Sequence, residues 1–141
     1  MSKLFVVGII VLVLIVGGFF LARSFMAPNT VNNPDTGNTS GVTGTPDVTF
    51  SITGENFKFT MNGVDNPDLK VKQGDKVKIE FSSVGGFHDW KIDEFNAATG
   101  RVSDGQTTSV EFVADKKGTF EYYCSVGEHR AMGMKGNFIV E

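Results

Sequence analysis

The chain has 141 residues, with 16 Asp and Glu against 13 Lys and Arg, and its formal net charge is −3. This length fits one ordinary domain with short appendages, and the mildly acidic balance excludes the strongly basic surface of a typical nucleic-acid-binding protein. The single cysteine excludes an internal disulfide and leaves a free thiol, an intermolecular link or a ligand.

The N-terminal segment, residues 1–27, is predicted to be a transmembrane anchor or a signal sequence. Residues 4–22 carry no charged side chain, and roughly 20 apolar residues let a helix span a bilayer. A cleaved signal peptide has a shorter apolar region of about 7–15 residues, and the bulky Phe25 and Met26 make a poor cleavage site. We therefore expect an uncleaved N-terminal transmembrane helix, with a removed signal as the alternative. The remaining chain is expected on the extracytoplasmic side, in the periplasm or outside the cell.

Residues 28–47 are predicted to form a flexible linker. They are dominated by Asn, Thr, Gly and Pro, and their only large apolar side chains are two valines. So little apolar surface cannot order a segment. As a flexible coil, the linker would reach about 25 Å.

Residues 48–141 are predicted to fold as one all-β domain of seven or eight short strands. Alternation of apolar and polar side chains, which is typical of strands with one buried face, recurs in many runs. The runs are residues 48–52, 57–61, 69–71, 77–81, 108–115, 119–124 and 136–141. Glycines, which are common in turns, separate these runs. This pattern favours a Greek-key β-sandwich or barrel.

The same alternation assigns individual side chains to faces of the strands. It places Phe57, Phe59 and Met61 on one shared face. It also points Cys124 inward and Tyr123 outward, at the end of a strand and just before a loop that contains glycine. A ligand in such a place is held by a rigid scaffold, while the loop supplies further donors.

The loop after Cys124 gathers donors that suit a soft metal. Four residues separate Cys124 from His129, four more separate His129 from Met134, and the only other histidine is His88. Thiolate and thioether ligands favour Cu(I), whereas imidazole binds both Cu(I) and Cu(II), so this mixture fits a mononuclear copper site for electron transfer. Alone, each residue has an ordinary structural explanation, such as a buried thiol. Their joint occurrence favours the metal.

The stretches "FHDW" and "GTFEYYCSVGEHRAMGMKGNFIV" resemble the cupredoxins, the small blue copper proteins, and the likeness covers residues 46–141. The loop spacing looks most like that of rusticyanin. The resemblance implies a cupredoxin-like fold and one copper ion of type 1. The ligands that it implies are His88, Cys124 and His129 in equatorial positions and Met134, in the frame "GMKG", in the axial position.

Two further expectations concern the surroundings of the site. The family often has asparagine after the first histidine, where this chain has Asp89, and its carboxylate is expected to accept N–H bonds near Ser125 and fix the cysteine. The second histidine of the family usually reaches the surface through an apolar patch, which is expected here around His129. Its members would be Val126, Ala131, Met132 and Gly133, with Phe87 nearby, and Glu128 and Arg130 would place charges at the rim.

The function implied is that of a membrane-tethered carrier of single electrons between donor and acceptor proteins that dock near His129, and not of an enzyme. A copper carrier or sensor is one alternative, and an electron-transfer subunit of a copper-dependent oxidoreductase complex is another. Two histidines are too few for a multicopper oxidase or a copper nitrite reductase, and one cysteine is too few for a dinuclear site. Zinc is disfavoured because thioether is a poor zinc ligand. No nucleic-acid partner is expected.

Overall fold

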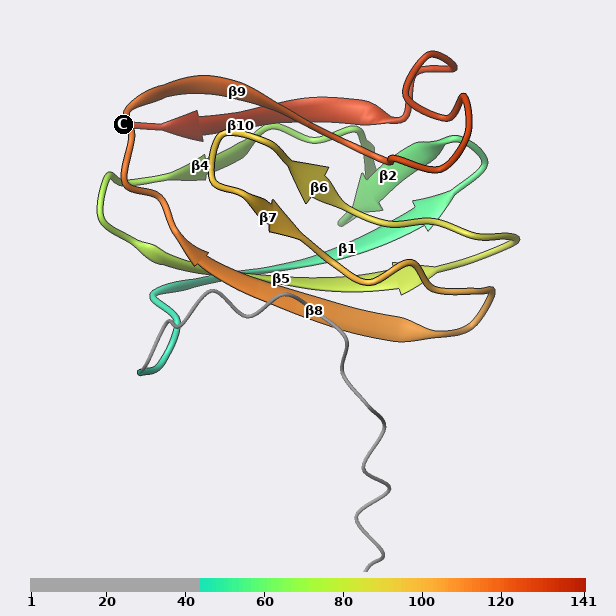
Figure 1. Cartoon of the computed structure of the whole chain (residues 1–141), viewed down its shortest axis with the longest axis horizontal. Helices are drawn as coiled ribbons and strands as arrows, with labels where there is room; N and C mark the ends of the chain where they lie inside the picture. The colour runs from blue at the N-terminus through green and yellow to red at the C-terminus, as the bar shows by residue number, and fades with distance from the viewer. Residues whose placement is uncertain (1–43) are drawn as a thin grey trace, which may run out of the picture. The chain divides into compact units, whose positions relative to one another are not determined.

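The structure is a computed structural model, and it describes residues 44–141 of the chain. Within this range the regular elements are ten β-strands, which Figure 1 shows as two layers. None of the described residues belongs to a helix with the length and apolar character needed to cross a membrane. The predicted transmembrane anchor or signal sequence, residues 1–27, and most of the predicted linker lie outside the described residues and remain predictions.

The strands form two five-stranded sheets. The first sheet has the order β3-β2-β1-β5-β8, with β1 at Val48–Glu55, β2 at Lys58–Met61, β3 at Val64–Asp65, β5 at Lys76–Ser83 and β8 at Thr107–Val113. The second has the order β4-β10-β9-β6-β7, with β4 at Leu69–Val71, β6 at Lys91–Ile92, β7 at Ala97–Ala98, β9 at Gly118–Tyr123 and β10 at Lys135–Val140.

Pairing between strands is mixed. The pairs β1–β5 and β4–β10 are parallel, and all other pairs are antiparallel. Because a parallel pair cannot be joined by a tight hairpin, the chain crosses between the two sheets before it returns. The predicted all-β sandwich is therefore confirmed. A strand was expected to begin at His88, and β6 lies just after it, but the short strands β3 and β7 were not predicted, since two residues are too few to show an alternation.

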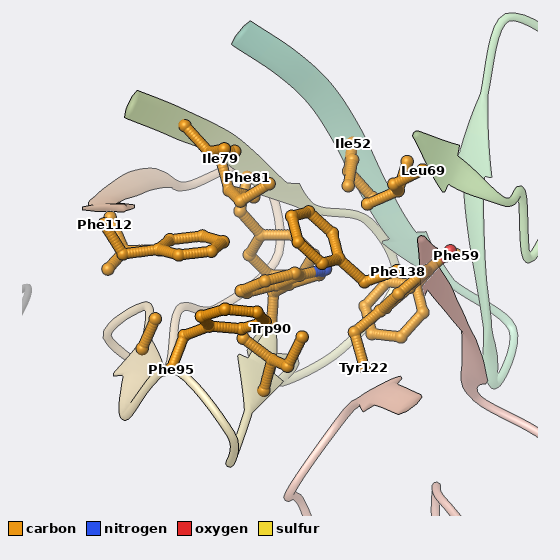
Figure 2. Packing of buried hydrophobic residues seen from close by; sticks show 14 of the residues in the cluster. Ile52, Phe59, Leu69, Ile79, Phe81, Trp90, Phe95, Phe112, Tyr122 and Phe138 are labelled. Atoms are coloured by element: carbon orange, nitrogen blue, oxygen red, sulfur yellow. The ribbon is translucent and has the colours of Figure 1, made fainter. Parts of the chain in front are cut away.

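Aromatic side chains from both sheets fill the interior (Figure 2). The indole of Trp90 stacks against Tyr122 with ring centroids 5.7 Å apart, and against Phe112 at 6.0 Å. Offset stacking of this kind adds about 0.5–1.5 kcal/mol per pair to the burial of the rings. This packed core makes the ends of the strands a rigid frame for the loops that they carry.

The loops that carry the predicted metal donors lie at one end of the sandwich. The loop from β9 to β10, the hairpin from β1 to β2 and the connection from β5 to β6 all lie at the right-hand end of the view in Figure 1. The donors predicted from the sequence lie in the first and third of these segments. The fold therefore places donors that are far apart in the sequence at one end of the domain.

One predicted side-chain placement is wrong. Phe57 was expected on the same strand face as Phe59 and Met61, but it lies in the turn between β1 and β2, with a φ of 59°, and β2 begins only at Lys58. The turn is tight because Glu55 pairs directly with Lys58. Phe59 is fully buried, whereas Phe57 is 43 % exposed.

Candidate metal centre

Three of the predicted donors meet at the loop end of the sandwich. One ligand atom from each of His88, Cys124 and His129 lies within 4.8 Å of the other two. The Sγ atom of Cys124 is 3.5 Å from Nδ1 of His129 and 4.0 Å from Nδ1 of His88. His88 and Cys124 are buried and His129 is half-buried.

These distances fit a single metal ion. With metal–sulfur and metal–nitrogen bonds of about 2.3 and 2.0–2.1 Å, a trigonal ion would hold sulfur and nitrogen about 3.8 Å apart. The two measured separations, 3.5 and 4.0 Å, lie on either side of this value. The thiol and the two Nδ1 atoms therefore need only small shifts to bind one ion together.

Met134 is the methionine that lies at this cluster. Its side chain is fully buried, its N–H donates to the carbonyl of His129 at 2.9 Å, and its carbonyl accepts from the N–H of Cys124 at 3.1 Å. Met132, by contrast, is 56 % exposed. The structure thus distinguishes the two methionines by burial, and the role of Met134 as axial ligand stays a prediction.

Gly54 in β1 provides the space for this arrangement. A Cβ atom at Gly54 would lie 2.7 Å from Cζ of Phe81, 2.9 Å from Cε of Met134 and 3.0 Å from Cβ of His88. The methyl end of Met134 and the base of the His88 side chain therefore meet over this glycine. No local pattern in the sequence indicates this role, because it depends on contacts between distant segments.

Burial shifts the pKa values of the two buried donors in the metal-free protein. Desolvation, reinforced by His129, lowers the pKa of His88, and Asp89 opposes this shift. Desolvation also raises the pKa of the Cys124 thiol. A metal ion reverses the second effect, because a coordinating thiol loses its proton to the ion's field. The site is therefore suited to binding a cation with release of a proton.

Asp89 ties the His88 segment to the cysteine loop, as predicted. Its Oδ1 atom accepts a hydrogen bond from the N–H of Ser125 at 2.6 Å, and its Oδ2 accepts one from the Ser125 hydroxyl at 2.5 Å. Bonds to an ionised acceptor are short and strong. Because Asp89 follows His88 and Ser125 follows Cys124, these two bonds fix the spacing of two donors.

Asn66 is a second anchor, and sequence reasoning missed it. Its side-chain Nδ2 donates to the carbonyl of Gly133 at 3.1 Å, and its Oδ1 accepts from the N–H of Phe59 at 3.0 Å. Asn66 adopts a φ of 44°, a left-handed conformation that asparagine tolerates. Asparagine next to proline marks a turn in the sequence, but its partner 67 residues away could not be inferred.

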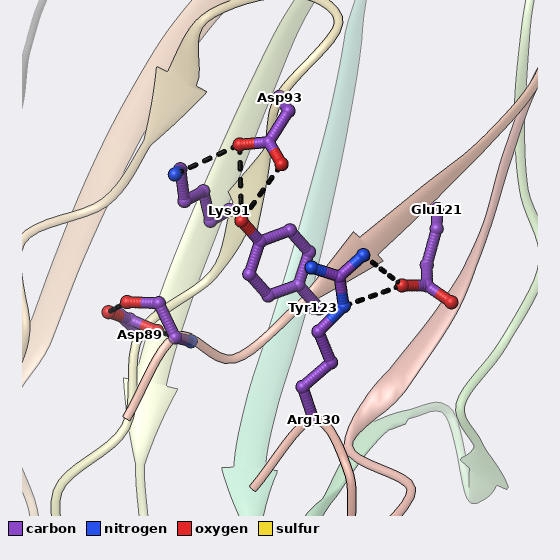
Figure 3. Close-up of polar contacts among 7 residues, drawn as sticks. Asp89, Lys91, Asp93, Glu121, Tyr123 and Arg130 are labelled. Atoms are coloured by element: carbon purple, nitrogen blue, oxygen red, sulfur yellow. Dashed lines mark hydrogen bonds and ion pairs between the residues drawn. The ribbon is translucent and has the colours of Figure 1, made fainter. Parts of the chain in front are cut away.

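Arg130, which was expected as a charge at the rim, is exposed, and its side chain is turned toward β9 (Figure 3). Its guanidinium donates to Oε1 of Glu121 at 2.7 and 2.8 Å and lies 3.8 Å from the ring centre of Tyr123. Lys135 pairs with the same carboxylate at 3.1 Å. Burial raises the pKa of Glu121, but the bonds from Arg130 and Lys135 outweigh it and lower that pKa overall. Tyr123 points outward as predicted, yet Arg130 helps to keep it buried.

Phe57 is the apolar side chain that the structure places against the ring of His129. Met132 and Phe87, which were expected in a patch around His129, are both exposed. Phe57 was not expected, and its ring stands almost perpendicular to that of His129, with centroids 4.9 Å apart and an interplanar angle of 84°. The only local signal for Phe57 was that it follows an asparagine, one of the residues that are common in tight turns.

Comparison with known proteins places this geometry among copper proteins. A family model described as "Copper binding proteins, plastocyanin/azurin family" matches residues 46–141. The chain is 33% identical over 84 residues to the copper-containing nitrite reductase of Neisseria gonorrhoeae. This alignment covers 52% of the chain and 21% of the reductase. It is 35% identical over 78 residues to the nitrous-oxide reductase of Stutzerimonas stutzeri, covering 52% of the chain and 12% of that enzyme.

Solved structures show a similar fold. Rusticyanin from Thiobacillus ferrooxidans aligns with a TM-score of 0.58 and 27% identity, over 76% of this chain and 87% of rusticyanin. Auracyanin B aligns with a TM-score of 0.61 and 22% identity, over 71% of this chain and 93% of auracyanin. The chain thus spans most of the length of these small proteins, but only about a fifth or less of the two reductases.

Proposed function

The chain belongs to the plastocyanin/azurin family of copper-binding proteins, and from this premise we propose that it is a type 1 copper protein that carries single electrons between partner proteins. One observation carries the proposal. His88, Cys124 and His129 bring one sulfur and two imidazole nitrogens within 4.8 Å of one another, and the buried thioether side chain of Met134 lies beside them. This donor set is that of a mononuclear electron-transfer copper site.

Copper bound here would supply the chemistry by alternating between Cu(I) and Cu(II). The protein supplies donors that both oxidation states accept: the thiolate of Cys124, the imidazoles of His88 and His129, and the weak thioether of Met134. It also holds them rigidly. Asp89 and the Ser125 backbone, together with Asn66 and Gly133, restrain the ligand segments, so their geometry changes little when the electron arrives or leaves.

We propose that electrons enter and leave through His129. Of the three clustered donors it is the least buried, and exposed apolar side chains of Phe57, Phe87 and Met132 lie around this end of the domain. A small apolar patch suits short-lived redox encounters, which bury little surface. The proposed partners are therefore donor and acceptor proteins. We further propose that residues 1–27 tether the domain to the extracytoplasmic face of a membrane.

The two reductases that resemble the chain raise the question of an enzyme. Their activities belong to proteins of which this chain matches about a fifth or less. Its two histidines are both at the candidate site, so this chain has no imidazole for a second copper centre. We therefore propose an electron carrier, with catalysis left to a partner.

A combined spectroscopic and electrochemical experiment tests this function. The full chain loaded with Cu(II) should be intensely coloured by thiolate-to-copper charge transfer, and voltammetry should show a reversible one-electron couple. Copper should also resist a mild chelator. Rapid loss of the metal would instead support a copper carrier or sensor, and an irreversible couple would contradict electron transfer.

The assignment of the axial ligand predicts different results for two methionine variants. Met134→Gln should change the visible and paramagnetic-resonance spectra and lower the reduction potential, because an amide oxygen is a harder donor than a thioether and stabilises Cu(II). Met132→Gln is the matched control, since its side chain is exposed, and should leave the spectra nearly unchanged. Equal effects of the two substitutions would contradict the assignment.

A further inference from the structure

The hairpin between β1 and β2 contains an unusual residue at its tightest point. Asn56 and Phe57 form the two-residue loop, with φ values of 45° and 59°. Both values are positive, as in a type I′ turn, where the preferred sequence is Asn followed by Gly. Asn56 fits the rule. Phe57 does not, because its Cβ atom crowds the backbone in the left-handed region.

Residues retained in a strained conformation often serve a function. Phe57 gains little from burial in the core, since 43 % of its surface stays exposed. What its position does provide is a ring that stands perpendicular to His129, with centroids 4.9 Å apart. The strained backbone therefore delivers an aromatic ring to a histidine of the candidate metal centre.

No protein group within residues 44–141 orients His129 through Nε2, as one often does for a metal-binding histidine. Such a histidine normally donates its second ring N–H to a carboxylate, a carbonyl or water. Within residues 44–141, no protein atom is hydrogen-bonded to Nε2 of His129, and the only side-chain contact in hydrogen-bonding range joins Nδ1 to Cys124. Its ring otherwise contacts the rings of Phe57 and His88, at 4.9 and 5.0 Å.

We propose that Phe57 is a positioning residue for His129. Its ring packs edge-on against the imidazole and holds it so that Nδ1 faces the sulfur of Cys124. The left-handed backbone of Phe57 is the structural condition for this contact. The choice of His129 as a copper ligand rests on the proposed function, but its orientation in the metal-free protein does not.

Histidine-labelled NMR of the metal-free full chain tests the orientation directly. The chain has only two histidines, so the imidazole signals of His88 and His129 form a simple spectrum in which each serves as a reference for the other. The variants are Phe57→Gly, which relieves the turn and removes the ring, and Phe57→Tyr, which keeps the ring. Phe87→Leu is the control, because it removes an exposed aromatic side chain with no ring contact to His129 among the described residues.

We expect Phe57→Gly to average the ring signals of His129 and to leave those of His88 in place. Phe57→Tyr and Phe87→Leu should both resemble the parent protein. The metal-free melting temperature of Phe57→Gly should change little, because relief of the turn offsets the lost contact. In copper-loaded protein, release of the metal to a strong chelator should be faster by roughly two- to tenfold, the factor that corresponds to one aromatic edge contact.

Unchanged His129 signals in Phe57→Gly would overturn the proposal. The proposal would also fail if Phe87→Leu averaged the His129 signals as much as Phe57→Gly does. If the glycine variant does not fold, Phe57→Leu gives the same decision, since it keeps the apolar bulk and lacks the ring. Failure of copper binding in the parent protein would refute the proposed function alone, because the metal-free spectra would still show whether Phe57 orders His129.

Discussion

Replacing Cys124 with serine should abolish the intense visible absorption of the copper-loaded protein and weaken copper binding by orders of magnitude. Cys124 is fully buried, and its sulfur is 3.5 and 4.0 Å from the two histidine nitrogens. A serine hydroxyl keeps the shape of the thiol, but it is a hard donor and stays protonated near neutral pH, so it gives neither the soft bond nor the charge-transfer band. Optical and paramagnetic-resonance titration with Cu(II) measures both effects.

The matched control for this substitution is Ser125→Ala. It removes a hydroxyl from the neighbouring residue and leaves the backbone N–H of Ser125, which donates a hydrogen bond to Asp89. This variant should keep the colour. Circular dichroism should show both variants folded when metal-free. An unaltered spectrum in Cys124→Ser would contradict both the ligand assignment and the proposed function.

Adding one methyl group at Gly54 should destabilise the protein without touching any donor atom. The new Cβ would meet Phe81, Met134 and His88 at 2.7–3.0 Å, and none of these neighbours lies at a free surface. Overpacking of this kind typically costs about 1–3 kcal/mol. For a domain of this size we expect the melting temperature of the metal-free protein to fall by roughly 5–20 °C. Copper spectra should change as well, since two of the three neighbours are predicted ligands.

Gly86→Ala is the control for the Gly54 substitution. The nearest atom to a Cβ at Gly86 is 3.6 Å away, an ordinary contact, and this glycine does not have a positive φ. Its melting temperature should stay close to that of the parent. Equal melting temperatures of Gly54→Ala and Gly86→Ala would contradict this prediction. They would show that the side chains of Phe81 and Met134 can shift to make room for the new methyl group.

The strands were predictable because each buries one face. Along β5, Val77, Ile79 and Phe81 are fully buried, while the residues between them are more exposed, so the period of two is visible in the sequence. The donors were predictable for a similar local reason. Cys124, His129 and Met134 share one short loop, and few other residues in the chain offer sulfur or imidazole.

What could not be predicted depends on contacts between distant segments. The alternation of apolar and polar residues in the sequence includes Phe57. Only the turn geometry shows that Phe57 lies outside the strand. Asn66 reaches a carbonyl 67 residues further along the chain, and Gly54 is required by side chains from three other segments. Arg130 reads as an unpaired charge until its partner, Glu121, is known. These residues are polar, small or at turns, so their pattern in the sequence contains no sign of the partner.

The placement of the donors along the chain also affects how copper and the unfolded protein interact. Three of the four predicted ligands lie within residues 124–134, whereas His88 is 36 residues away from Cys124. A loop of about ten residues closes within roughly 10–100 ns, so the denatured chain can already chelate the metal with this one segment. A ligand that also binds the denatured state stabilises the native state by less than its affinity indicates. Copper-linked stability should therefore depend mainly on His88, the one ligand that joins only when the sandwich assembles.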